Sequence, residues 1–328
     1  LDVGRCVLPA STLTHLGIFG NGRFFTSVLS FLKSQDLAEA KERAERLEVE
    51  LNKVIPTFVK RNKEYVQWKE RDEIMRVTAA AVCEGIKPQA GFVTLVKRGT
   101  HLDEIVSNIL FPYTNVSLQQ ILERVEKMPN ERKEAIIKTY AGERKDRRDR
   151  TGRGIEAGYP YTFDLVGSYA EYRDLQRHRM LTQQRQTLTT EIGFIMPPEM
   201  TVVGLGKEVE RVVAQMEDLN SDIRHVGLRT AAQYATLFNH RMRFILGMNL
   251  REVQHLAELR TQPAGHFSYR GMAMEMARKV TERDPWAANT LQFVDYSDPE
   301  NKIARAKEQS RIAGKNLAKD IDDSKDFM

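Results

Sequence analysis

The spacing of apolar residues divides the first third of the chain into helices and one strand. Helical periodicity covers about 24–54, and a charged, helix-prone connector follows at 60–86. The apolar run GFVTLV at 91–96 is typical of a strand, and LDEIVSNILF at 102–111 predicts the helix after it. A new structural unit therefore begins near residue 91.

The same pattern continues through the rest of the chain. Residues 117–143 predict two helices separated near Pro129, and YTFDLVGSY at 161–169 predicts a strand that leads into a helix carrying Arg-His-Arg. Beyond the Pro-Pro pair at 197–198 we expect further helices and a polar helical tail, at 206–219, 228–247, 249–260, 268–281 and 302–325. Strands alternating with helices predict an α/β (α+β) fold with a helix-rich domain.

Composition limits the class of protein. The chain has 328 residues, of which 41% are hydrophobic and 29% charged, as in globular proteins that bury a sizeable core. No apolar run approaches the roughly 20 residues that span a bilayer, and the N-terminus lacks the layout of a signal peptide. We therefore expect a cytoplasmic protein with no membrane segment.

Cysteines and charge narrow the possible ligands. Cys6 and Cys83 are too few for a disulfide framework and are not spaced as a zinc site, so we predict reduced thiols and no metal site. The net charge of +5 permits a nucleotide phosphate as readily as nucleic acid. The basic cluster at 144–153 favours a solvated loop, with nucleic-acid binding as the weaker alternative.

The first candidate site is the Arg-His-Arg triplet formed by Arg177, His178 and Arg179. On a helix these side chains would fan out over about 200°, so all three can face one ligand only if the helix ends there. The following LTQQRQTLTT favours extended chain because threonines disfavour a helix interior. Guanidinium and hydroxyl donors suit a phosphate, a carboxylate or the edge of a heteroaromatic ring, whereas the alternative is ordinary surface charge.

The second candidate site is the predicted helix NLREVQHLAELR at 249–260. Asn249 and Arg260 project from one face about 16 Å apart, and Arg251 and His255 share a neighbouring face. The alternative is an amphipathic core helix with a solvated polar flank. No HExxH, GxSxG, GxxxxGK[ST] or strand-linked GxGxxG motif is present, so zinc hydrolysis and P-loop chemistry have no support.

The chain contains one internal repeat. GIFGNGRFFTSVLSFLKSQ at 17–35 can be aligned with ILGMNLREVQHLAELRTQP at 245–263, which pairs Asn21 with Asn249. Downstream, Pro56 in the first copy corresponds to Pro285 in the second. These matches indicate a duplicated helical unit.

Together these motifs resemble the flavin-dependent thymidylate synthases, the thymidylate synthase complementing protein family. In that family Arg-His-Arg is followed after seven residues by a Ser, and here Met180 to Gln186 separate the triplet from Thr187. NLREVQHLAELR resembles the second signature, in which Asn-x-Arg opens a helix that ends in Leu-Arg. The resemblance covers roughly 91–298 and implies a mixed or antiparallel sheet.

The resemblance implies ligands and residue roles. Family members bind FAD, dUMP and methylene-tetrahydrofolate, use NADPH, and form homotetramers whose sites lie between subunits. The FAD contacts would fall on six residues of this chain, Arg177, His178, Arg179, Asn249, Arg251 and His255. The pyrimidine nucleotide would be bound by Arg185, Thr187 and Arg260, and Arg260 would polarise the pyrimidine as the catalytic residue.

The chain departs from the family pattern at positions that the family uses to bind the nucleotide. An Asn-Glu pair of the family is replaced by Gln184 and Arg185, two phosphate-binding arginines by Thr189 and Gln233, and a histidine by Gly158. Two functions therefore remain open: an enzyme that makes dTMP from dUMP, and a non-catalytic flavin or nucleotide binder with a role in assembly.

The resemblance also suggests a domain organisation. GRCVLP and GNGR in the first block match further family segments, so we expect 1–60 to be the end of a truncated first copy of the domain. A helical connector at 61–90, a complete domain at 91–298 and a helical tail at 299–328 would follow.

Overall fold

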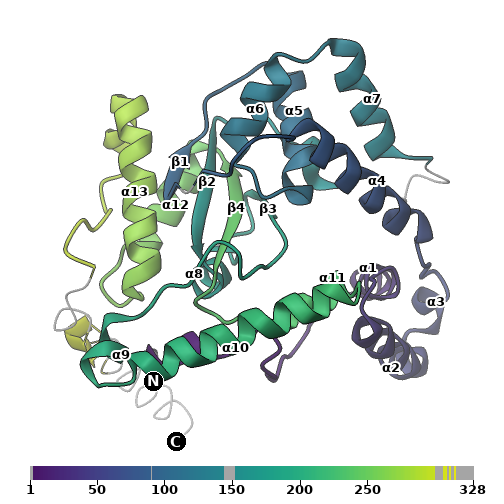
Figure 1. Cartoon of the computed structure of the whole chain (residues 1–328), viewed down its shortest axis with the longest axis horizontal. Helices are drawn as coiled ribbons and strands as arrows, with labels where there is room; N and C mark the ends of the chain where they lie inside the picture. The colour runs from purple at the N-terminus through teal and green to yellow at the C-terminus, as the bar shows by residue number, and fades with distance from the viewer. Residues whose placement is uncertain are drawn as a thin grey trace, which may run out of the picture.

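The computed structural model describes residues 3–89, 91–143, 152–299 and 306–308, together with 310, 311 and 314. Its centre is a four-stranded antiparallel sheet of order β1-β2-β4-β3 (Figure 1). The strands are β1 (Val93–Leu95), β2 (Tyr161–Ser168), β3 (Thr182–Arg185) and β4 (Arg241–Met248). The two inner strands pair over their whole length, from Tyr161 opposite Met248 to Ser168 opposite Arg241.

Helices surround this sheet and account for most of the described chain. They are α1 (Gly22–Lys33), α2 (Ala38–Val54), α3 (Pro56–Val59), α4 (Val66–Val82), α5 (His101–Leu110), α6 (Leu118–Glu126), α7 (Asn130–Ala141), α8 (Tyr169–Leu175), α9 (Pro198–Val202), α10 (Gly206–His225), α11 (Arg229–Ala232), α12 (Leu250–Arg260) and α13 (Phe267–Arg283). Short 3-10 helices are η1 (Val3–Val7), η2 (Phe111–Tyr113), η3 (Arg153–Glu156), η4 (Gln233–Ala235) and η5 (Pro285–Thr290). The predicted helix-rich α/β fold with an antiparallel sheet is confirmed.

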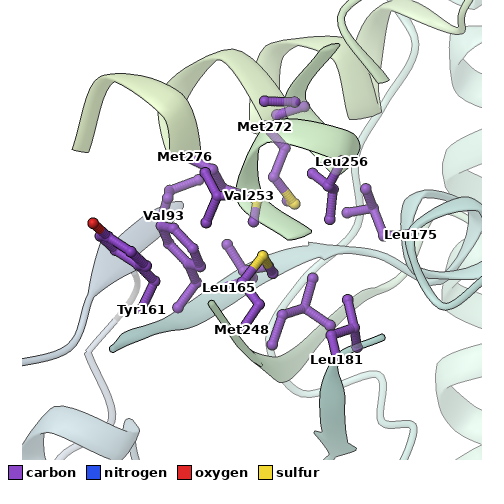
Figure 2. Packing of buried hydrophobic residues seen from close by; sticks show 14 of the residues in the cluster. Val93, Tyr161, Leu165, Leu175, Leu181, Met248, Val253, Leu256, Met272 and Met276 are labelled. Atoms are coloured by element: carbon purple, nitrogen blue, oxygen red, sulfur yellow. The ribbon is translucent and has the colours of Figure 1, made fainter. Parts of the chain in front are cut away.

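The sheet separates two apolar layers because alternate side chains of a strand point to opposite faces. One face packs against α8, α12 and α13, and Figure 2 shows this cluster, including Tyr161, Leu165, Met248, Val253 and Met272. The other face packs against α4, α5, α6 and α7. Figure 1 shows the two helical layers on opposite sides of the strands.

The helix predicted at 228–247 is wrong, because residues 241–247 of this range belong to the inner strand β4. Seven of the eight β4 residues are buried, with helices over both faces of the strand. A strand covered on both faces loses its alternation of apolar and polar positions. Its sequence RMRFILGM therefore cannot be distinguished from a buried helical segment by periodicity alone.

Other predicted elements match the structure closely. The strand and helix predicted at 91–111 are β1 and α5, and the helices predicted on either side of Pro129 are α6 and α7. The predicted helical range 24–54 is divided into α1 and α2. Most of the basic cluster, at 144–151, and most of the tail at 302–325 lie outside the described residues.

A buried ion pair links the sheet to the second helical layer. Asp164 of β2 accepts hydrogen bonds from Nη1 of Arg243 on β4 at 2.9 and 3.0 Å, and both side chains are buried. The same carboxylate accepts a bond of 2.7 Å from the backbone N–H of Leu118, in the first turn of α6. Arg243 also donates to the carbonyl of Gln89. The pair therefore joins β2, β4, α6 and the segment before β1.

The N-terminal residues pair with the segment that precedes β4. Leu8 accepts a backbone hydrogen bond from Phe238 at 2.8 Å, and Ala10 donates one to Thr236 at 2.7 Å. Cys6 packs with Met200 and other apolar side chains of α9 and α10. Helices α1 to α3 follow and have their own small core, formed by Leu29, Ala44, Leu51 and Val59.

His240 is a buried, neutral histidine at the start of β4. Its Nδ1 accepts a hydrogen bond of 2.9 Å from the Leu237 N–H, so the proton of the neutral ring is on Nε2. Glu217 Oε1 lies 3.7 Å from Nε2. The side chain is fully buried, and this burial lowers the pKa of His240 to about 4.

We expect the free energy of unfolding to depend on pH through His240. Because its folded pKa of about 4 is below the ordinary value of 6.5, the unfolded chain binds a proton that the folded chain rejects. The free energy of unfolding therefore has its full value above pH 6.5, and it falls by about 3 kcal/mol as the pH drops to 4. Urea unfolding across this range measures the effect, and His240→Gln is the control that accepts from Leu237 without titrating. Equal pH dependence in both proteins would contradict the prediction.

Candidate functional site

The Arg-His-Arg triplet lies in the turn between α8 and β3. Helix α8 begins with a capping box between Ser168 and Glu171 and ends at Leu175, so it does not carry the triplet as predicted. Residues 177–179 are not helical, and this is the condition for all three side chains to act together. Arg177 and Arg179 are exposed, whereas His178 between them is buried.

His178 is held by a carboxylate and a guanidinium from the same helix. Its Nδ1 lies 2.9 Å from Glu252 Oε1, and its Nε2 accepts a hydrogen bond of 3.0 Å from Arg260 Nε. Glu252 is buried and Arg260 half-buried, and the Arg260 guanidinium lies over the ring of Tyr269 at 5.7 Å. We call His178, Glu252 and Arg260 the histidine network.

The histidine network defines the protonation state of His178. Because the Arg260 N–H can only donate, Nε2 must be unprotonated, and the ring proton is then on Nδ1 and donates to Glu252. Burial lowers the pKa of His178, the bond to Glu252 works against this, and the Arg260 charge lowers it further. His178 is therefore a neutral ring that positions Arg260, whose Nη groups remain available to a ligand.

The signature residues of α12 have different environments. Asn249 caps the helix, because its side chain accepts a hydrogen bond of 3.1 Å from the Glu252 N–H. Arg251 and His255 are exposed on the neighbouring face, as the spacing predicts. The His255 ring lies 5.4 Å from the His178 ring. The structure thus brings the two signatures together around the histidine network.

A large cleft lies at the other end of β3 from this network. It has a volume of about 1180 Å³ and is lined by α4, by η2, by the loop after β3 and by α11. Thr187, Thr189 and Gln233 line it, together with basic residues from distant parts of the sequence, Lys69, Arg71, Arg76, Arg153, Arg224 and Arg229. Four carboxylates line it as well and pair with four of these bases: Asp36 with Lys69, Asp72 with Arg71, Glu73 with Arg76 and Glu191 with Arg224. Among the described residues, Arg153 and Arg229 have no ion-pair partner. These two guanidiniums are therefore the part of the cleft that suits an anionic ligand.

Arg185 and Gln233 are in contact at the edge of this cleft. Arg185 Nη1 donates to Gln233 Oε1 at 3.2 Å, and the same oxygen accepts from the Leu188 N–H at 3.2 Å. Gln184 does not face the cleft and donates to the Asn108 carbonyl at 3.0 Å. Two positions that depart from the family pattern are thus joined by a hydrogen bond.

The histidine network and the cleft do not form one pocket within a single chain. Thr182 at one end of β3 pairs with Gly247, next to α12, whereas Arg185 at the other end leads to the cleft. At about 3.3 Å per residue, β3 alone separates them by roughly 10 Å. None of the histidine network residues lines the cleft.

Glu252 is the site residue that sequence reasoning missed. It lies at the third position of α12, where a carboxylate normally caps the helix N-terminus and carries no sign of a tertiary role. Arg229 was not singled out either, since exposed arginines are common, whereas Arg153 belongs to the basic cluster at 144–153. In the described part of the chain, no group of three or more His, Cys, Asp or Glu side chains could hold a metal, and no helix has the length and apolar character to cross a membrane.

Comparison with known proteins gives one family and several relatives. The model of the thymidylate synthase complementing protein family matches residues 115–286. A UPF0159 protein of Chlamydia muridarum is 34% identical over 323 residues, which are 95% of this chain and 60% of the relative. UPF0159 proteins of Chlamydia pneumoniae and Thermoplasma acidophilum are 33% and 28% identical, over 91% of this chain and 58% and 60% of their own lengths. The chain thus spans about 60% of the length of these relatives.

Proposed function

The chain belongs to the thymidylate synthase complementing protein family, and from this premise we propose that it binds FAD beside the histidine network and a pyrimidine nucleotide in the cleft. The proposed reaction is the reductive methylation of dUMP, or a related nucleotide, to dTMP, with methylene-tetrahydrofolate as carbon donor and NADPH as reductant. The observation that carries the proposal is the contact of Arg260 with His178, which unites the two family signatures.

The residues around the histidine network fit a flavin dinucleotide. Arg177, Arg179, Arg251 and His255 are exposed donors around a buried neutral ring, and a pyrophosphate and the acceptor atoms of a flavin require donors of this kind. His178 and Asn249 would contribute mainly by holding the turn and the start of α12. Bound FAD would supply the hydride chemistry, so the chain would need no nucleophile of its own.

The nucleotide phosphate would be bound by cleft arginines that replace the family's own. Thr189 and Gln233 carry no positive charge, so they cannot supply the bidentate ion pair that an arginine forms with a phosphate, in which each hydrogen bond is worth roughly 1.5–3 kcal/mol. Arg153 and Arg229 line the same cleft without an acidic partner, and Arg185 reaches Gln233 at its edge. Thr187 would donate its hydroxyl to the nucleotide.

A second copy of the chain would complete the site. Arg260, proposed to polarise the pyrimidine as the catalytic residue, lies near the Thr182 end of β3, whereas Thr187 lines a separate cleft at the other end, so the two do not share a pocket in one chain. In a homo-oligomer such as a homotetramer, the histidine network of one subunit would face the cleft of another. The substrates would be a dUMP-like nucleotide and a folate.

We expect the purified protein to be yellow and to take up FAD. The double variant Arg177→Ala, Arg179→Ala should bind FAD about 100-fold more weakly, since two charge-assisted hydrogen bonds are lost. The matched control is Arg132→Ala, an exposed arginine of α7 on the other side of the sheet. Fluorescence titration with FAD measures the affinities.

Turnover is tested on the flavin reduced anaerobically by NADPH. Reoxidation should require both dUMP and methylene-tetrahydrofolate, and Arg229→Ala should weaken dUMP binding without changing the FAD affinity. A colourless protein that takes up no FAD would refute the proposal.

The departures at the nucleotide-binding positions favour a second candidate function, a non-catalytic flavin or nucleotide binder. Besides Thr189 and Gln233, the family histidine is replaced by Gly158, which has a positive φ of 103° that L side chains rarely adopt. Rescue of a thymidine auxotroph by this chain would exclude this candidate.

We also propose that residues 1–60 repeat the end of the complete domain at 91–298, with 61–90 as a connector and 299–328 as a tail. Asn21 caps α1 by accepting from the Phe24 N–H at 3.0 Å, as Asn249 caps α12 at 3.1 Å. Helices α2 and α13 each have 17 residues, and the elements after them begin at Pro56 and Pro285. The order of elements thus supports the duplication.

A further inference from the structure

An apolar segment before α1, residues 13–19, is exposed and forms no backbone hydrogen bond with the described residues. Every residue from Ser11 to Phe19 is exposed, and Leu13, Leu16 and Phe19 are 85%, 78% and 102% exposed. Within the described part of the chain, the backbone groups of residues 13–20 form no hydrogen bond. Apolar side chains and unpaired peptide groups on one extended segment are the features of an uncovered strand.

The internal repeat aligns this segment with β4. With Asn21 on Asn249, Leu16 corresponds to Phe244 and Ile18 to Leu246. In β4 both equivalents are fully buried, on the face that packs against α12 and α13. The segment therefore repeats two apolar positions that face the core in an inner strand.

Helix α1 also has an incompletely covered face. Phe25 and Val28 correspond to Val253 and Leu256 of α12 in the same alignment. The α12 residues are buried against the sheet, whereas Phe25 and Val28 are only half-buried. The face of α1 that would meet a sheet is thus partly open, although α1 and α2 already pack together.

We propose that residues 13–19 are the inner strand of a second antiparallel sheet, whose neighbouring strands come from polypeptide that the longer relatives possess. Two strands equivalent to β2 and β3 would pair with the two edges of residues 13–19, just as β2 and β3 pair with the two edges of β4. The inference rests on the proposed duplication and not on the proposed chemistry.

The relatives are long enough to contain these two additional strands. The 323 matched residues are 60% of the Chlamydia muridarum relative, so about 215 residues lie outside the match. The stretch from Val93 to Asn249, which holds β1 to β4 here, is shorter than this. A second copy of this chain fits less well, because its own segment 13–19 could pair with only one of the two edges.

Hydrogen–deuterium exchange tests the proposal on the longest natural form of the protein, with residues 1–328 alone as the reference. Amides of residues 13–19 should exchange at least about 100-fold more slowly in the longer form, and rapidly in residues 1–328. Ile18→Lys should restore rapid exchange in the longer form. The matched control, Val203→Lys, changes an apolar side chain that is 65% exposed outside the repeat and should have no effect.

Two outcomes would overturn the proposal. Rapid exchange of residues 13–19 in both forms would mean that no strand pairs with them. Protection in residues 1–328 alone that grows with protein concentration would identify a second copy as the occupant. Because the measurement needs no flavin or nucleotide, its failure leaves the FAD titration unaffected, and the reverse also holds.

Discussion

Replacing Asp164 by Asn is expected to lower the free energy of unfolding by about 3–5 kcal/mol. The substitution leaves the Arg243 guanidinium buried without its carboxylate, to which it donates at 2.9 and 3.0 Å. It also removes the negative charge of the carboxylate that accepts a hydrogen bond from the Leu118 N–H in the first turn of α6. Since a domain of ordinary size is stable by only about 5–15 kcal/mol, the variant should be close to unfolding at 37 °C.

Two controls separate this effect from simple loss of an ion pair. The double variant Asp164→Leu, Arg243→Met removes both charges and should recover most of the loss, because well-packed apolar residues often replace a buried pair without cost. Glu208→Gln breaks the exposed pair with Arg211 on α10 and should leave the free energy of unfolding close to that of the wild type, because solvent screens exposed charges. Urea unfolding of the four proteins gives the comparison. A single Asp164→Asn variant as stable as the wild type would show that the buried pair contributes nothing.

The type of most elements could be predicted from local pattern, whereas the central strand could not. LDEIVSNILF has helical spacing and is α5, and the Pro at 129 separates α6 from α7 as expected. In β4, burial on both faces leaves the apolar run FILGM at 244–248 without alternation, and this pattern depends on the helices that cover the two faces. The helix predicted at 228–247 fails for that reason, which is a property of the tertiary structure.

The candidate site was predictable in its residue types but not in its division of roles. Arg177 and Arg179 could be identified by their motif, yet nothing in the triplet reveals that His178 alone is buried. Burial of that ring depends on Glu252 and Arg260, which are more than 70 residues away in sequence. The cleft likewise combines α4 with the loop after β3, a contact that spacing along the chain cannot predict.

Replacing Glu252 by Leu is expected to weaken FAD binding by about 10–100-fold. The leucine fills the space but accepts no hydrogen bond, so the buried Nδ1–H of His178 loses its partner. The ring can then move its proton to Nε2, where it would face the Arg260 N–H that donates there in the wild type. Two donors cannot bond to each other, so Arg260 would lose its fixed position beside the proposed flavin.

A nitrogen-15 NMR measurement of His178 tests this network without any ligand. In the wild type, the shifts should report a protonated Nδ1 and an unprotonated Nε2, and in Glu252→Leu a mixture of both tautomers. Glu258→Leu is the matched control, since Glu258 lies on the same helix and accepts from the Phe293 N–H at 3.1 Å instead. If the tautomer changes but FAD affinity does not, the network exists and does not position the flavin site. An unchanged tautomer in Glu252→Leu would show that Glu252 does not determine the orientation of Arg260.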